Sequence, residues 1–398
     1  MLCAQARGHG RSRAAARKLA REVSGQTGGF ALPPRETLVR VAATLALSTA
    51  GGGLFALIGL PAAWISGGML FVAASSLGGF QTEIPSGLRN VVFLVLGVIS
   101  GTGVTPATLN EVSSWPVSFF ALAITVILVT VGSYLLLVRM FRWDRHSALF
   151  AALPGALSFV LAAAEMTSAD LRRVAIAQSL RLIILLEALP LAAFLAGVHP
   201  SAVSARGVAS VDWGELFLLF AAGAVCGFLL YKLRIPGGQM LGGLLAAAVL
   251  CVSGVVETAI PAFILIPSLI GIGAIAGCRL RPEDRSLLPK ILTAAGASFA
   301  IAVVISAIGA AITSMILDIS LLQTFMAFAP GALEALTILA FTMNVDPAYV
   351  AAHHVVRFAA LALAVPLLAR WLMRQEGHAA PDPEEPWQRG RSERAKKK

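Results

Sequence analysis

Nine residues with ionisable side chains interrupt stretches of the sequence that are otherwise apolar. They are Glu165, Asp170, Arg181, Glu187, Glu334, Asp346, His353, His354 and Arg357. On insertion scales, a charged side chain at the centre of a membrane-spanning helix costs on the order of 2.5–3.5 kcal/mol. If the apolar stretches are membrane spans, these side chains are therefore the first candidates for binding a solute or an ion.

Two arginines in this set each follow an aspartate by 11 residues, which is about three helical turns. Asp170 and Asp346 are expected to cap a helix or to stand in its first turn, where the helix dipole favours an acid. Arg181 and Arg357 then lie inside the spans. Two interpretations remain open: each guanidinium extends to the membrane surface, or it points into a central cavity and attracts an anionic group of a substrate.

Glu334 follows Pro330 by four residues, in a stretch where Pro and Gly should break the helix. Its carboxylate could bind a proton or cation that drives transport, or could accept hydrogen bonds from the backbone amides that the break frees. His354 precedes Arg357 by three residues and shares its helix face, so a proton relay is conceivable there. A simple hydrogen-bonded role is the alternative for both His354 and His353.

The remaining spacing does not support metal or nucleotide chemistry. A copper or iron centre needs several histidines or carboxylates that converge on one metal, yet the six histidines form no H-x-H, H-x-x-H or H-x-x-x-H pair. The four cysteines include no C-x-x-C pair. A Walker A motif and a nucleophile elbow are also missing. We therefore expect no enzymatic activity, no cofactor and no metal site.

The elements that carry these residues follow from composition. Of the 398 residues, 57% are hydrophobic and 13% are charged, whereas soluble domains are about 45–50% apolar and about 25% charged. This excludes a disordered chain, a disulfide scaffold and an ordinary cytosolic enzyme. A crossing needs about 20 apolar residues, so the length allows roughly ten transmembrane helices. We predict an all-α polytopic membrane protein, with spans near 38–58, 60–79, 88–104, 116–138, 172–197, 214–231, 236–256, 262–278, 291–314 and 348–370.

An internal repeat is visible at an offset of 175 or 176 residues. The matched elements are Pro61, Gly67 and Gly68 with Pro236, Gly242 and Gly243; Gly97 and Gly101 with Gly273 and Gly277; and Pro154 and Gly155 with Pro330 and Gly331. Ser158 and Glu334 are equivalent polar residues. The glycines are expected to permit close helix packing, and the Gly-Gly pairs could also open helices near the midplane of the membrane.

Charged loops give equivalent spans opposite orientations. Loop 105–115 has no Lys or Arg and loop 139–147 has three, so span 116–138 should run from outside to inside. The equivalent span 291–314 follows a loop with four basic residues and precedes 315–320, which has none, so it should run from inside to outside. This pattern predicts an inverted repeat.

The predicted organisation is a basic cytoplasmic tail at 1–37, a first membrane repeat at 38–198, a linker at 199–213, a second membrane repeat at 214–374 and a second basic cytoplasmic tail at 375–398. The inversion requires an odd number of crossings in each half, but each half contains one apolar stretch too many.

Those extra stretches are 146–164 and 321–342, and each has a Pro-Gly pair near its middle. We predict that both are re-entrant or broken segments, because a break in the helix frees backbone groups that must then find protein partners or line a cavity. Each half would then have five transmembrane helices and one Pro-Gly segment. The alternative is that both stretches are short spans and one charged loop is misplaced.

In their order along the chain, these motifs resemble the duplicated AbrB-type membrane protein family. They are Pro-x-x-x-x-x-Gly-Gly, Pro154–Gly155–Ala156–Leu157 followed by Asp170–Leu171–Arg172–Arg173–Val174, and the second-half copy. The resemblance covers residues 38–373. It implies a membrane protein that is suspected to transport a solute, although its members often carry the label of an ammonia monooxygenase and one is linked to regulation of gene expression. The sequence does not look like the small soluble DNA-binding regulator that shares the name.

We therefore predict a secondary transporter or exporter of a small solute, with proton or ion coupling as one option, in a bacterial-type cytoplasmic (inner) membrane. A membrane-bound sensor that regulates gene expression is the alternative, and a membrane monooxygenase is least favoured. Membrane lipid and the solute are the expected partners, and a homo-oligomer is compatible with the sequence. Nucleic acid is not expected, because the positive-inside rule explains the basic tails. The candidate binding residues are Pro154, Gly155, Ser158, Arg181, Pro330, Gly331, Glu334, His354 and Arg357.

The predicted topology can be tested by labelling single cysteines in a variant whose native cysteines are serines. A membrane-impermeant maleimide added outside the cell should label cysteines placed in 105–115 and 315–320, because both loops are predicted to be external. Cysteines in 139–147 and 279–290 should react only after the membrane is opened. Labelling of either predicted external loop only from the inside would exclude the inverted repeat.

Overall fold

The computed structural model describes residues 35–105, 108, 112–155, 157–195, 211–233, 235 and 237–377, without the side chains of 114, 158, 159, 193 and 369–377. Both predicted tails, apart from the helical ends next to them, and most of the linker lie outside these residues, as does Pro236 of the repeated motif. The chain divides at Arg40 into two units, residues 1–40 and 41–398. Residues 35–40, at the start of the first helix, are the described part of the first unit, and every later helix lies in the second unit.

The described residues form helices and no strands, which confirms the all-α prediction. Six helices are long and apolar enough to cross a membrane: α2 (Arg35–Leu57), α6 (Trp115–Arg139), α9 (Leu171–Leu195), α10 (Trp213–Lys232), α13 (Leu288–Leu317) and α16 (Pro347–Gly377). The outer faces of these helices are apolar. Phe120 and Phe217, on α6 and α10, expose 71% and 76% of their surface. Several long apolar helices with such faces make this a multi-pass membrane protein.

Four further apolar helices are shorter than the sequence predicts. They are α3 (Ala63–Leu77), α4 (Ser86–Thr102), α11 (Gly238–Val252) and α12 (Ala262–Gly277), with 15, 17, 15 and 16 residues. Each is shorter than the roughly 20 residues of a typical crossing. The predicted spans 60–79 and 236–256 include the turns before these helices, where Ala62 and Gly237 cap the helix starts with a left-handed backbone (φ 49° and 67°).

Both Pro-Gly stretches are broken helices. The first consists of α7 (Arg145–Ala152) and α8 (Leu157–Ala164), and the second of α14 (Leu321–Phe328) and α15 (Leu333–Thr342). Two short 3-10 helices, η1 (Val112–Ser114) and η3 (Pro282–Ser286), precede α6 and α13.

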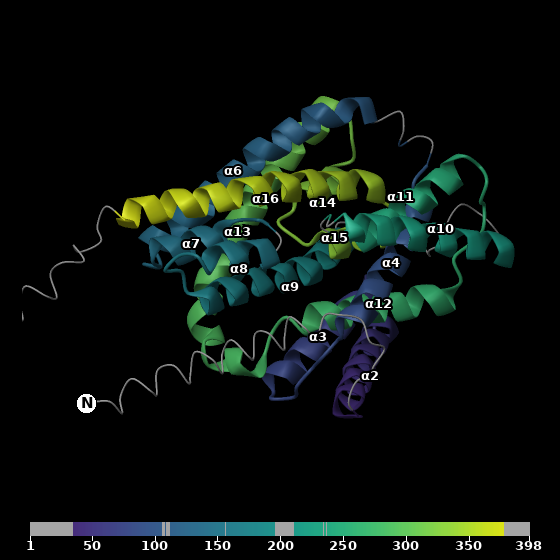
Figure 1. Cartoon of the computed structure of the whole chain (residues 1–398), viewed down its shortest axis with the longest axis horizontal. Helices are drawn as coiled ribbons and strands as arrows, with labels where there is room; N and C mark the ends of the chain where they lie inside the picture. The colour runs from purple at the N-terminus through teal and green to yellow at the C-terminus, as the bar shows by residue number, and fades with distance from the viewer. Residues whose placement is uncertain are drawn as a thin grey trace, which may run out of the picture. The chain divides into compact units, whose positions relative to one another are not determined.

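Helices from the two halves of the sequence pack in exchanged pairs (Figure 1). Helix α4 lies against α11, and its repeat equivalent α12 lies against α3, which is the equivalent of α11. Helices α6 and α13, which are also equivalent, pack against each other. The halves are thus interlocked rather than separate bodies.

Glycine residues let the backbones of the paired helices, α12 with α3 and α4 with α11, come into contact. A Cβ atom added to Gly273 or Gly277 of α12 would lie 2.8 Å from Ile65 O or 2.7 Å from Met69 O, on the backbone of α3. On the other pair, a Cβ at Gly97 or Gly101 of α4 would overlap carbonyl oxygens of α11. The remaining predicted packing glycines, Gly67, Gly68, Gly242 and Gly243, also meet a neighbouring helix at distances that exclude a side chain.

We expect Gly97→Ala to destabilise the fold, because the new methyl group would overlap the Met240 carbonyl oxygen and the helices must move apart. Overpacking of this kind costs about 1–3 kcal/mol. The matched control is Gly296→Ala on α13, where nothing lies within 4 Å of the added Cβ. Thermal unfolding in detergent should show a lower melting temperature for Gly97→Ala and no loss for the control. Equal melting of both variants would contradict close packing of α4 on α11.

Candidate functional site

The two helix breaks have the same backbone geometry. Leu153 is the C-terminal cap of α7 and Ala329 is that of α14, and each lies directly before the proline. Proline has no N–H group, so it cannot continue the helical hydrogen bonds. The following glycine turns back instead: Gly155 N donates to Leu153 O (2.9 Å) and Gly331 N donates to Ala329 O (2.8 Å). Both breaks therefore leave backbone carbonyls that need further donors.

The equivalent arginines supply those donors. Arg181 on α9 donates to Leu153 O through Nη1 and Nη2, both at 3.3 Å. Arg357 on α16 donates to Ala329 O (2.7 Å), and its Nη2 reaches Gly331 O (2.8 Å). Neither side chain extends to the membrane surface in the manner of the first interpretation. Each instead binds the break of its own half from the long helix that follows it.

A second equivalent pair lies one turn earlier on the same helices. Gln178 Nε2 donates to Phe150 O (2.8 Å), and His354 Nε2 contacts Met326 O (3.2 Å). Arg357 Nη2 can only donate, so the His354 Nδ1 atom that it contacts at 2.6 Å must be the unprotonated nitrogen. The proton of His354 therefore lies on Nε2 and is used in the bond to Met326 O. This geometry favours the hydrogen-bonded role of His354 over the proton relay.

Each break also packs against the long helix of the other half. A Cβ atom added to Gly331 would lie 2.8 Å from Leu185 Cδ2 of α9, and one added to Gly155 would lie 3.3 Å from Leu361 Cδ1 of α16. Leu185 and Leu361 are themselves separated by 176 residues in the sequence. The Pro-Gly turns are thus held from both halves at once.

Glu334 lies in the first turn of α15, directly after the second break. Its Oε1 atom is 3.7 Å from the position of a Cβ on Gly237, the residue at the N-terminal cap of α11. The caps of both helices, Ala332 and Gly237, have no side-chain hydrogen bond to the helix start. A carboxylate between two helix starts is favourable, because unpaired amides and the helix dipole both attract negative charge.

Arg279 is the basic residue that sequence reasoning does not select, because its position assigns it to the cytoplasmic loop 279–290. In the structure it is partly buried at the end of α12 and interacts with Glu334. Burial lowers the pKa of the Arg279 guanidinium, Glu334 raises it, and Arg89 lowers it further. The only signal for this residue in the sequence is its position directly after the predicted span 262–278.

The charge of Arg279 acts on Arg181, and the charge of Arg181 acts on Arg357. The guanidinium groups of Arg181 and Arg357 lie at the two breaks. We call these three residues the arginine cluster (Arg181, Arg279 and Arg357). Chemically, such a region can bind an anion by charge-assisted hydrogen bonds.

Other predicted residues have structural roles. The aspartates are helix caps: Asp170 Oδ1 accepts from Arg172 N and Arg173 N, both at 3.1 Å, and Asp346 Oδ1 accepts from Ala348 N at 2.8 Å. Burial raises the pKa of Asp346, and hydrogen bonds from Thr108 and from backbone amides partly offset this effect.

His353 lies in an aromatic environment on α16, beside the rings of Phe119, Phe328 and Tyr349. Its Nδ1 contacts Tyr349 O (2.7 Å) and its Nε2 contacts Ser118 Oγ (2.6 Å). The side chain of Ser158 is outside the described residues, so the predicted match to Glu334 has no structural description. Within the described residues, no group of three or more His, Cys, Asp or Glu side chains could hold a metal ion.

The residues at the start of the first broken segment, α7–α8, contact the residues that follow its end. His146 Nδ1 contacts Ser168 Oγ (2.5 Å), and Asp170 N donates to Ser147 Oγ (2.7 Å). Since Pro154 lies between these contacts in the sequence, α7 and α8 leave from and return to the same position. The two ends of this segment are therefore in contact, with the Pro-Gly turn between them in the sequence.

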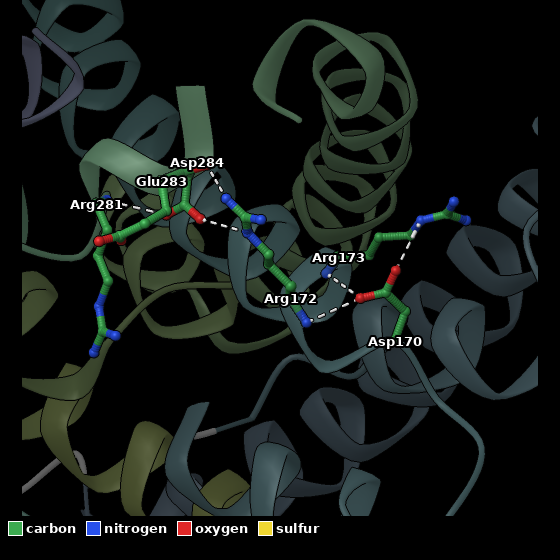
Figure 2. A network of polar contacts seen from close by, with 6 residues as sticks. All are labelled: Asp170, Arg172, Arg173, Arg281, Glu283 and Asp284. Carbon is green, nitrogen blue, oxygen red and sulfur yellow. Dashed lines mark hydrogen bonds and ion pairs between the residues drawn. The ribbon is translucent and has the colours of Figure 1, made fainter. Parts of the chain in front are cut away.

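An ion-pair network joins the start of α9 to η3 of the other half (Figure 2). Arg172 Nε contacts Asp284 Oδ1 at 3.2 Å, and the same guanidinium donates to Glu283 O. Arg173 pairs with Asp170 at 3.1 Å within the first turn of α9. Asp284 is buried, whereas Asp170, Arg172 and Arg173 are partly exposed. Ion pairs with an exposed partner contribute little energy, but these contacts place the start of α9 beside the loop before α13.

Comparison with known proteins identifies the family. Residues 64–373 match the family described as "Transition state regulatory protein AbrB", which is most of the chain. The chain belongs to the AbrB family. This confirms the resemblance found in the motifs, including the two Pro-Gly elements, which lie within the matched range.

Two relatives are similar to most of the length of this chain. "Putative regulator AbrB" of Escherichia coli (strain K12) is 26% identical over 328 residues, which cover 80% of this chain and 92% of the relative. "Uncharacterized protein YhjN" of Bacillus subtilis (strain 168) is 23% identical over 368 residues, which cover 86% of this chain and 95% of the relative. The similarity therefore extends across both halves of this AbrB-family chain.

Arg357 has three hydrogen-bond acceptors and Arg181 has one, so the same substitution should affect the two residues differently. Arg357→Lys should destabilise the protein, because one ammonium group cannot reach Ala329 O, Gly331 O and His354 Nδ1 together. A buried carbonyl left without a donor costs about 1–3 kcal/mol. Arg181→Lys is the matched control, because a lysine can still reach the single carbonyl of Leu153. Unfolding in detergent should rank Arg357→Lys below Arg181→Lys, and the reverse order would contradict this assignment.

Proposed function

We propose that this AbrB-family protein is a secondary transporter of a small solute and that the solute binds between the two Pro-Gly breaks. The observation that carries the proposal is the matched pair of breaks, each held by an equivalent arginine of its own half and a leucine of the other half. Discontinuous helices at equivalent positions of two repeats are the usual mark of a transporter binding site.

The proposed topology has ten crossings in two inverted repeats of five helices, with α7–α8 and α14–α15 as re-entrant hairpins. The meeting of Ser147 and Asp170 supports this assignment, because a full crossing would separate them by the membrane thickness. The contact of Arg172 with Asp284 supports a common side for the starts of α9 and α13. Trp115 and Tyr349, with ring centroids 5.9 Å apart, support a common side for the starts of α6 and α16.

In this proposal both termini face the cytoplasm and the membrane is the bacterial cytoplasmic membrane. The basic tails support this orientation through the positive-inside rule. The protein would carry out no enzymatic reaction and need no cofactor. Its partners would be membrane lipid and the solute, and opening and closing would occur where α9 and α16 pack against the other half.

A regulatory function is the second candidate. It is favoured by the family description, and the relative from E. coli also carries the word regulator in its name. Purified protein in liposomes separates the two functions, because a transporter moves solute without any other protein. Solute movement in protein-containing but not in empty liposomes supports transport. Absence of movement across a broad metabolite screen, with gene expression altered in a deletion strain, would support regulation instead.

A substitution of Glu334 tests whether this residue couples transport to protons or to another ion. Glu334→Gln removes the titrating charge and keeps the size and hydrogen-bonding capacity of the side chain, so transport should lose its dependence on pH or on a coupling ion while the protein still folds. Glu165→Gln is the matched control, because Glu165 is exposed and follows the first broken segment. Flux in liposomes at several pH values measures the effect. Full transport with unchanged pH dependence in Glu334→Gln would remove this residue from the mechanism.

A further inference from the structure

Helix α6 has an exposed apolar stripe that ends at a basic residue. Five apolar residues follow one another at intervals of three or four positions, so they share one helix face, and each exposes between 36% and 71% of its surface. Arg139 is the next position of this series, four residues after the last of them, and it is the final residue of α6. The five residues of the α6 stripe are Phe120, Ile124, Leu128, Val131 and Leu135.

The loop after α6 adds two more arginines at the same end. Arg142 and Arg145 are exposed, as is Arg139, and none of the three forms an ion pair with a residue that the structure describes. The acid of loop 139–147 is Asp144, and its Oδ1 caps α7 by accepting from Ser147 N at 2.7 Å. The loop therefore presents three guanidinium groups at the end of the stripe, with one carboxylate that already has a structural role.

Contacts with α9 hold this loop in place. The guanidinium carbon of Arg173 lies over Trp143, 5.9 Å from the centre of its ring, and Ser147 Oγ accepts from Asp170 N at 2.7 Å. Arg173 is itself paired with Asp170 at 3.1 Å (Figure 2), so its charge is already balanced. A loop fixed in this way holds its other arginines ready to bind a ligand, which lowers the entropy that is lost on binding.

The opposite end of α6 has the opposite charge. Residues 105–115, which precede the helix, include Glu111 and no Lys or Arg. The stripe therefore has cationic side chains at one end only. A molecule that fits it has apolar chains and an anionic group at one end, which is the chemistry of an anionic phospholipid. Each Lys or Arg beside the membrane strengthens the binding of such lipids by about fivefold.

We propose that this end of α6 is a binding site for an anionic phospholipid. The acyl chains lie along the α6 stripe, and the phosphate group accepts charge-assisted hydrogen bonds from Arg139, Arg142 and Arg145. The proposal is independent of the transport function proposed above, and it holds whichever side of the membrane the loop faces.

The lipid class can be tested on the full-length protein in detergent, by native mass spectrometry and by thermal unfolding. Phosphatidylglycerol and phosphatidylcholine with identical acyl chains are compared, because they differ in headgroup charge. Phosphatidylglycerol should bind in a saturable manner and raise the melting temperature more than phosphatidylcholine does. Equal binding and equal stabilisation by the two lipids would overturn the proposal.

Two soluble probes separate a lipid site from a simple phosphate site. Glycerophosphoglycerol is the same headgroup without acyl chains, and inorganic phosphate is the charged group alone. Neither can contact the α6 stripe, so neither should stabilise the protein at concentrations at which phosphatidylglycerol does. Stabilisation by inorganic phosphate that matches that by the lipid would show a free-anion site and overturn the proposal.

A triple variant tests the arginines. It should bind phosphatidylglycerol about tenfold more weakly or worse, with unchanged binding of phosphatidylcholine. The matched control removes three exposed positive charges from the segment before α13, which the contact of Arg172 with Asp284 places beside the start of α9, and should keep its affinity within about twofold. The test variant combines Arg139→Gln, Arg142→Gln and Arg145→Gln, and the control combines Arg281→Gln, Arg285→Gln and Lys290→Gln.

A charge-conserving variant guards against a folding defect. Lysine at positions 139, 142 and 145 keeps the three charges, so this variant should retain most of the affinity and the melting temperature of the lipid-free protein. An equal loss of affinity in the two glutamine variants would mean that binding follows the total charge of this end of the protein, and the specific site would be wrong. Full affinity in the variant without the three loop arginines would exclude them as headgroup ligands.

Discussion

The hydrogen-bonding demand of the carbonyl groups directly before Pro154 and Pro330 governs the centre of this protein. Each helix stops at this point, so the carbonyl loses the amide that would have followed it in the next turn, and the hydrocarbon region has no water to replace that amide. Arg181 and Arg357 meet this demand from the next long helix of each half. This explains why a strongly cationic side chain is retained in an apolar helix, and it fixes the distance between each break and the helix behind it.

The same centre depends on the exchange of partners between the halves. Each Pro-Gly turn lies against a leucine of the other half, and around it α4 packs on α11 while α12 packs on α3. Because glycine brings these helices to backbone contact, a change in one half is transmitted directly to the other. The two breaks are therefore held within one packed centre. Their chemistry is nevertheless unequal, since Gln178 stands where the second half has His354, and Ser158 stands where it has Glu334.

Much of this arrangement could be predicted from the sequence, because duplication makes weak signals visible twice. The repeat, the helical class, the breaks and the positions of Arg181 and Arg357 all follow from composition and from matched spacing. The capping roles of Asp170 and Asp346 were one of the predicted options, and the structure selects it. The short length of α3 and α11 was not predictable, because hydropathy does not show that a turn residue at the start adopts a left-handed backbone.

Arg279 and Gln178 could not be predicted, for a different reason. Arg279 stands at a helix end, where an arginine normally indicates the aqueous side, and only the folded structure shows that the charge of Glu334 acts on it. Gln178 is uncharged, so it is not among the residues that are costly to place in a membrane, although it binds Phe150 O as His354 binds Met326 O.

The contact between Gly155 and Leu361 also constrains how the protein is made. About 200 residues separate these two positions in the sequence, so during translation the first Pro-Gly turn is made long before its leucine partner emerges from the ribosome. The first half must therefore persist as an incompletely packed intermediate until α16 is inserted, and the insertion machinery or its chaperones must shield that turn from lipid in the meantime.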